Sequence, residues 1–140
     1  MRKITTIFTL IFSLAALTKI HAQDKSWAST TISIPVSNLG QSVNWYKKLL
    51  MIEESISPAP EVIEFKINDN TWVQLFEVET FTNSQNILRL EVDAIKEAHK
   101  RVSQLTTNIQ GIEYIENVVY YFDFSDPDGN LLSFYQIPSE

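Results

Sequence analysis

The sequence predicts an α+β fold made of two copies of one module, each running strand, helix and three further strands. The strand and helix of the first copy recur in the second, where Val92 takes the place that Val36 has in the first. Both helices carry a single apolar stripe, which is typical of a helix that covers one face of a sheet. The chain then closes with two aromatic and β-branched segments around a tight turn, the pattern of a hairpin.

The first module is expected over about residues 30–79. Residues 30–36 are β-branched and alternate in polarity, which indicates a strand with one buried face. Asn38 is a suitable helix cap, with Gln41 three residues later, and the helix should end near Leu50. Further strands are expected at 52–57, 62–67 and 71–78. The turns between them are Pro58-Ala59-Pro60 and Asn68-Asp69-Asn70.

The second module is expected over about residues 86–137, with a strand at 87–92 and a helix at 93–105. Asp93 is the expected cap of this helix. Glu97 and Arg101 have the i,i+4 spacing of an ion pair on its exposed side. A short strand at 111–116 and the closing hairpin complete the module. In that hairpin, Asp126-Pro127-Asp128-Gly129 predicts a tight turn, because proline fixes φ and glycine frees the exit.

The first 22 residues are predicted to lie outside the fold, as a secretory signal peptide. A basic start precedes an apolar run at 4–17 that is too short to span a bilayer, and Ala22 is a suitable cleavage position. A membrane anchor is the alternative, but no stop-transfer stretch follows. The sequence therefore predicts a periplasmic or secreted protein. Since it has no cysteine, neither disulfides nor lipid attachment at the cleavage site would support the exported domain.

Charge restricts the class of partner. The formal net charge is −6, and cleavage after Ala22 would make the protein more acidic because Arg2, Lys3 and Lys19 would be lost. An acidic surface without a basic run argues against nucleic acid and, after signal cleavage, against anionic membranes. There is no glycine-rich phosphate loop among only three glycines.

Three segments together resemble the vicinal oxygen chelate superfamily, which includes glyoxalase, bleomycin-resistance and extradiol-dioxygenase-like proteins. They are residues 34–39, the helix 42–50 and the closing segment 124–132, and the resemblance covers nearly all of the chain after residue 22. It implies paired βαβββ modules whose mixed sheets curl into a cup, with one helix outside each module. In enzymes of this family, the cup holds a divalent metal on four histidines or carboxylates, and the metal acts as a Lewis acid.

At the positions that the resemblance assigns to metal ligands, this chain carries unsuitable side chains. These positions are Thr31, Gln74, Ile87 and Ser133. Two hydroxyls, an amide and an isoleucine cannot replace the imidazole and carboxylate donors of a catalytic metal. We therefore expect no metal, no cofactor and no catalytic residue, which favours a protein that is not an enzyme. His99, the one histidine after the signal, is expected outside the cup.

Alternation predicts the side chains that face the cup. If Ile32, Ile34 and Val36 face the helix, their neighbours face the other way. The predicted lining is partly apolar and aromatic with a few polar groups, as in small-molecule sites. The candidate ligand-binding residues are Thr31, Ser33, Trp72, Gln74, Ile87, Arg89, Ser133 and Tyr135.

Arg89 has two interpretations, and so do the aromatic residues. An inward cation in an acidic protein favours an anionic ligand, whereas an ion pair with Glu91 or Asp123 would merely neutralise both charges. Trp72 and Tyr135 would stack on a flat aromatic ligand or belong to the core.

Three functions from different classes stay open. The first is an exported small-molecule-binding protein of the glyoxalase/bleomycin-resistance type that is not catalytic. The second is a metal-dependent lyase, isomerase or dioxygenase with a rearranged site, drawn from Glu64, Glu91, Asp123 and His99. The third is a protein-interaction module, which predicts a filled cup and an exposed apolar patch. A homodimer, with or without exchange of modules between chains, is also open.

Overall fold

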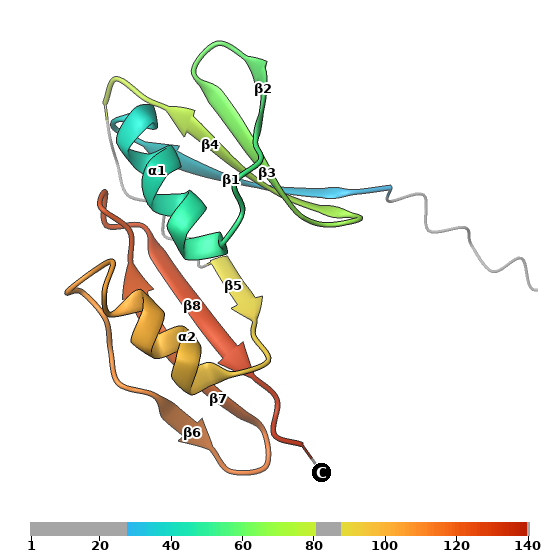
Figure 1. Cartoon of the computed structure of the whole chain (residues 1–140), viewed down its shortest axis with the longest axis vertical. Helices are drawn as coiled ribbons and strands as arrows, with labels where there is room; N and C mark the ends of the chain where they lie inside the picture. Colours follow the sequence, from blue (N-terminus) through green and yellow to red (C-terminus); the bar gives the residue numbers. More distant parts are fainter. Residues whose placement is uncertain (1–27, 81–87, 140) are drawn as a thin grey trace, which may run out of the picture.

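The computed structural model describes residues 28–80 and 88–139, so the expected signal peptide and Ile87 lie outside the described residues. Figure 1 shows two modules, each with one helix lying across its own sheet. The first contains β1 (Thr30–Val36), α1 (Leu39–Leu50), β2 (Ile56–Ala59), β3 (Val62–Asn68) and β4 (Thr71–Glu77). The second contains β5 (Leu88–Glu91), α2 (Ile95–Val102), β6 (Glu113–Ile115), β7 (Val119–Ser125) and β8 (Leu131–Gln136).

The two modules share one topology. Their strand orders are β1-β4-β3-β2 and β5-β8-β7-β6. In each, the first strand pairs in parallel with the last, and the remaining pairs are antiparallel. These mixed sheets are curled but not closed. The predicted α+β fold of paired βαβββ modules is confirmed.

One face of each sheet packs on its helix and forms the core. In β1, Ile34 and Val36 are buried while their neighbours Ser33 and Thr31 are exposed, so the alternation predicted for this strand is confirmed. The same contrast occurs in β4, β5 and β7, whereas the edge strands β2 and β6 are exposed throughout. The buried apolar side chains are Ile34, Val36, Tyr46, Leu49, Phe65, Val73, Leu75, Leu88, Ile95, Ala98, Val102, Phe122, Phe124, Leu132 and Phe134. We call the opposite, helix-free face of each sheet its cup face.

The two helices begin differently. Asn38 caps α1 as predicted, since its side chain accepts a hydrogen bond of 2.9 Å from the Gln41 amide. The prediction that Asp93 caps the second helix is wrong: the cap position is Ala94, which has no capping side chain. Instead, Gln136 of β8 accepts a hydrogen bond from the Ile95 amide at 2.9 Å. Neither helix, nor any other in the described residues, is long and apolar enough to cross a bilayer.

Two smaller expectations are also corrected. Glu97 and Arg101 do not form an ion pair; within the described ranges only Lys66 and Asp69 come within 4.0 Å as opposite charges. The second strand of the first module begins at Ile56 and includes Pro58, rather than ending before it. Proline is compatible with this position because β2 is an edge strand, where an amide donor can be absent without breaking a ladder.

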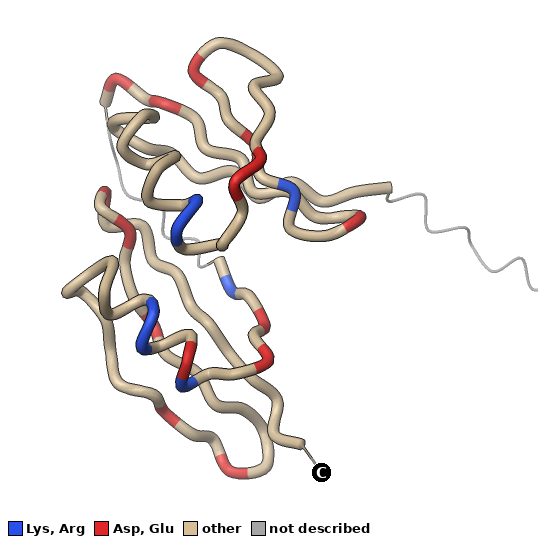
Figure 2. Tube along the Cα trace, viewed as in Figure 1, with Lys and Arg blue, Asp and Glu red and all other residues tan. Residues whose placement is uncertain are grey.

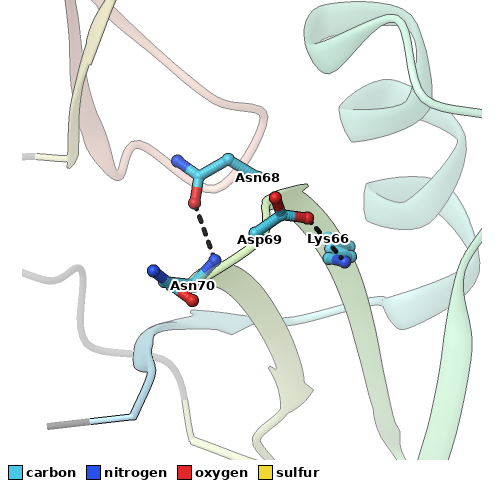
Figure 3. Close-up of polar contacts among 4 residues, drawn as sticks. All are labelled: Lys66, Asn68, Asp69 and Asn70. Carbon is cyan, nitrogen blue, oxygen red and sulfur yellow. Dashed lines mark hydrogen bonds and ion pairs between the residues drawn. The ribbon is translucent and has the colours of Figure 1, made fainter.

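The predicted turn between β3 and β4 is confirmed at residues 68–70. The Asn70 amide donates to Oδ1 of Asn68 at 3.0 Å, and Lys66 pairs with Asp69 at 3.2 Å (Figure 3). Local hydrogen bonds of this kind let an Asn side chain stand in for a backbone turn.

The predicted turn of the closing hairpin is confirmed, and it also joins the modules. The Asp126 carbonyl accepts a hydrogen bond of 3.0 Å from the Gly129 amide, and Gly129 has a φ of 84°, which only glycine adopts freely. The turn contacts the first module through three side chains. Tyr46 of α1 donates to Asp126, Ser37 donates to Asp128, and Asn130 donates to the Pro35 carbonyl.

Candidate ligand-binding site

The cup face of the second module contains a cavity of about 570 Å³. Its polar lining is a row across three strands: Arg89 of β5 is opposite Ser133 of β8, which is opposite Asp123 of β7. Adjacent strands are about 4.8 Å apart, so the Cα atoms of Arg89 and Asp123 are separated by roughly 10 Å. The volume is in the range of small-molecule sites.

Two tyrosines form the next row of this cavity. Tyr121 of β7 is opposite Tyr135 of β8, and both line the cavity. The Tyr121 hydroxyl donates a hydrogen bond of 2.7 Å to Glu113 of β6. This hydrogen bond, more than any other influence, raises the pKa of Tyr121 above its usual value, and the charge of Arg89 opposes the rise. The phenol is therefore a neutral, positioned group at neutral pH.

Arg89 is not neutralised by a protein carboxylate. No carboxylate in the described ranges lies within 4.0 Å of its guanidinium, so the expected alternative of a pair with Glu91 or Asp123 is not formed. Asp123 is likewise without a hydrogen-bond partner for its buried Oδ1 atom within those ranges. Ser133, between the two charges, is buried and its hydroxyl donates to the Phe122 carbonyl at 3.3 Å.

The first-module candidates form a separate polar row. Ser33 donates to the side-chain oxygen of Gln74 at 2.9 Å, and the Gln74 nitrogen donates to Glu64 at 2.7 Å. Thr31 and Trp72 are opposite each other in the next row of the same face. None of these residues lines the second-module cavity.

The structure thus brings together three of the eight predicted residues: Arg89, Ser133 and Tyr135. Thr31, Ser33, Trp72 and Gln74 are on the cup face of the other module, and Ile87 lies outside the described residues. Sequence reasoning missed Tyr121 and Asp123 as lining residues. Their alternation with the buried Phe122 and Phe124 was a usable signal, but the nearly unbroken aromatic run of β7 obscured it.

The described side chains do not fit the metal site that the resemblance implies. Gln74 already bonds through both amide atoms, and Ser133 donates to backbone. His99 packs edge-on against Phe122, which is on the helix face of β7, so it is outside the cup as expected. Within residues 28–80 and 88–139, no three His, Cys, Asp or Glu side chains are grouped suitably for a metal ion. The rearranged cluster of Glu64, Glu91, Asp123 and His99 is not formed.

Comparison with known proteins supports the fold. No protein-family model matches the sequence, and no curated protein is significantly similar to it. Solved structures do match. A glyoxalase/bleomycin resistance protein from Catenulispora acidiphila is 20% identical, with a TM-score of 0.65 over 79% of this chain and 98% of that one.

Two further solved structures match similarly. A fosfomycin resistance protein from Mesorhizobium loti is 18% identical, with a TM-score of 0.62 over 79% of this chain and 91% of its own. A lactoylglutathione lyase from Agrobacterium tumefaciens is 16% identical, with a TM-score of 0.63 over 78% of this chain and 92% of its own. The chain therefore has the fold of vicinal oxygen chelate proteins, as the resemblance in sequence implied.

Proposed function

We propose that this chain, which has the vicinal oxygen chelate fold, is an exported protein that binds a small molecule on the cup face of its second module without catalysing a reaction. The observation that carries the proposal is the cavity of about 570 Å³ that contains Arg89, Ser133 and Tyr135. A cation that has no carboxylate partner among the described residues, with aromatic rings beside it, favours a ligand with an anionic group and a flat body.

The donor set supports the non-catalytic part of the proposal. A catalytic divalent metal in this fold would need several imidazole or carboxylate ligands, and the chain offers Thr31, Gln74 and Ser133 there. Ser133, the serine in the described cavity, also lacks the neighbouring general base that would activate it as a nucleophile. Its hydroxyl donates to a backbone carbonyl, and His99 packs on the opposite face of the sheet.

Export is proposed from the sequence of residues 1–22, whose basic, apolar and small-residue regions follow in the order of a signal peptide. Asp and Glu positions occur along both modules (Figure 2), which agrees with a partner that is neither nucleic acid nor an anionic membrane.

A homodimer is also proposed, because three apolar side chains beside the cavity are exposed. Ile115 is 49% exposed, Val118 54% and Ile137 53%, and all three line the cavity. Clustered exposed apolar side chains are typical of an interface. A second copy that covers them would enclose the ligand, and a symmetric pair would bury the same side chains of both copies. The exposed apolar side chains also agree with the interaction-module alternative, whereas the cavity does not, because that alternative predicts a filled cup.

Binding of an aromatic carboxylate tests the proposal. We expect 4-methylbenzoate, titrated by NMR, to shift cup-face resonances in the wild type. We expect Arg89→Gln to weaken this binding about tenfold or more, because the carboxylate loses its cation. The matched control is Lys66→Gln, which removes an exposed lysine that pairs with Asp69 in the other module. Equal loss in both variants, or no binding by the wild type, would contradict the proposal.

A further inference from the structure

The inference concerns the carboxylate of Asp123 at the far end of the cavity from Arg89. Asp123 is half-buried, and its Oδ1 atom is fully buried without a hydrogen-bond partner in the described part of the chain. Buried carboxylate oxygens normally accept hydrogen bonds, because an unsatisfied charged acceptor is costly. Oδ1 itself is closed to solvent, so a donor in the cavity would reach Asp123, which lines the cavity, through the other carboxylate oxygen.

Arg89 is not that donor in this structure. Ser133 separates the two residues in the sheet register, so that two strand spacings lie between them. No ion pair forms between them within 4.0 Å. The cavity therefore has a positive end at Arg89 and a negative end at Asp123, and both ends lack a partner of opposite charge among the described residues.

Two tyrosines line the cavity beside the charged row. Tyr121 and Tyr135 are opposite each other on β7 and β8, one row away from the charged row. Both charges act on Tyr121: Asp123 raises its pKa and Arg89 lowers it. Arg89 and Asp123 thus influence the same ring from within the same cavity.

From this arrangement we propose that the second-module cavity selects small aromatic zwitterions. The ligand's carboxylate or other anionic group binds Arg89, its protonated amine donates to Asp123, and its ring lies against Tyr121 and Tyr135. This inference rests on the proposed function, because it names the class of ligand for the same cavity. It differs in its prediction: an anion alone should bind measurably but more weakly than a zwitterion with the same ring, since it leaves the Asp123 carboxylate unpaired.

Three probes with one ring separate the contributions. They are 4-(aminomethyl)benzoate, which carries both charges, 4-methylbenzoate, which carries only the anion, and 4-methylbenzylamine, which carries only the cation. We expect the zwitterion to bind at least about tenfold more tightly than either single-charge probe, as measured by NMR titration of the exported protein. Equal or tighter binding of 4-methylbenzoate would overturn the inference and leave the proposed function intact. Failure of all three probes to bind would overturn both.

A substitution then locates the preference. We expect Asp123→Asn to remove the advantage of the zwitterion and to retain binding of 4-methylbenzoate, which also shows that the variant is folded. The matched control is Asp69→Asn, an exposed carboxylate of the β3–β4 turn, which should keep the full preference. An unchanged preference in Asp123→Asn, or an equal loss in Asp69→Asn, would overturn the assignment of the amine to Asp123.

Discussion

The Tyr46 hydroxyl donates a hydrogen bond of 2.8 Å to Oδ2 of Asp126, so a buried side chain of α1 is tied to the β7–β8 turn of the other module. Asp126 also accepts hydrogen bonds from the backbone and side-chain nitrogens of Asn130, both at 2.8 Å. The same turn contacts Ser37 and Ser42 through Asp128. These hydrogen bonds fix the β7–β8 turn of the second module against the first module, and they therefore help to orient the two cup faces.

Replacing Tyr46 should destabilise the protein. Tyr46→Phe leaves the buried Asp126 carboxylate with one donor fewer, and a hydrogen bond to a charged group contributes about 2 kcal/mol to the free energy of unfolding. Urea denaturation measures this loss. Tyr121→Phe is the matched control, because it removes an exposed tyrosine–carboxylate bond and should destabilise the protein much less. Similar losses of unfolding free energy in the two variants would show that the burial of the Tyr46–Asp126 hydrogen bond adds nothing to stability.

Alkaline pH should reveal the same bond. Burial, and then the Asp126 carboxylate, raise the pKa of Tyr46 well above its usual value. The folded protein thus holds this proton more tightly than the unfolded chain, whose tyrosines titrate near pH 10. The stabilisation is complete below about pH 10 and is lost as the pH rises further, through the pKa of the folded protein, with a slope of at most about 1.4 kcal/mol per pH unit.

The measurement is the difference in unfolding free energy between wild type and Tyr46→Phe from pH 8 to pH 11. Other groups titrate alike in both proteins, so the difference isolates Tyr46. It should be constant up to about pH 10 and then shrink. A difference that stays constant to pH 11 would contradict the direction of this pKa shift.

Metal analysis tests the non-catalytic assignment. After dialysis against Zn²⁺ or Mn²⁺ and removal of free ions, we expect far less than one equivalent bound per chain, because residues 28–80 and 88–139 contain no suitable group of donors. His99→Ala serves as the control, since it removes any Zn²⁺ that this imidazole holds outside the cup. One equivalent retained by both proteins would mean that the chain has a metal centre after all.

Export should leave a defined product. When the full sequence is expressed in a bacterium with a periplasm, the protein should be recovered outside the cytoplasm with Gln23 as its first residue. Intact mass spectrometry of the recovered protein measures the cleavage position. Replacing Ala22 with a bulky residue, as in Ala22→Trp, should block processing. Recovery of the uncleaved chain in the membrane fraction would favour the anchor instead.

Self-association should depend on the exposed apolar residues beside the cavity. Ile137→Glu places a charge among them and should weaken a dimer about tenfold or more, as measured by sedimentation velocity. Met51→Glu is the control, since Met51 is 69% exposed but does not line this cavity. A wild type that is monomeric at about 100 μM, or equal effects of the two substitutions, would argue against the dimer.

Local pattern was sufficient for most of the fold. The 30–36 strand and its buried face follow from β-branched alternation, the Asn38 cap from its side chain, and the 126–129 turn from its proline and glycine. Local pattern did not predict the start of the second helix. The first amide of this helix, that of Ile95, donates to the side chain of Gln136, which belongs to a strand 41 residues later. Asp93 was the best local candidate, and a distant side chain replaced it.

By itself, the sequence determined which side chains can share a face, since strand alternation is a property of neighbouring residues. It also supplied the residue types behind the expectation of no metal, since Thr31, Gln74 and Ser133 carry neither imidazole nor carboxylate. Only the tertiary structure decided which charges meet. Arg89 could have paired with Glu91 or Asp123, and neither carboxylate comes within 4.0 Å of it. Tyr46 looked like one residue of an apolar stripe, and the packing of the modules made its hydroxyl a donor to Asp126. Pairing of charges and burial of polar atoms depend on distances between segments far apart in the chain, which local patterns do not specify.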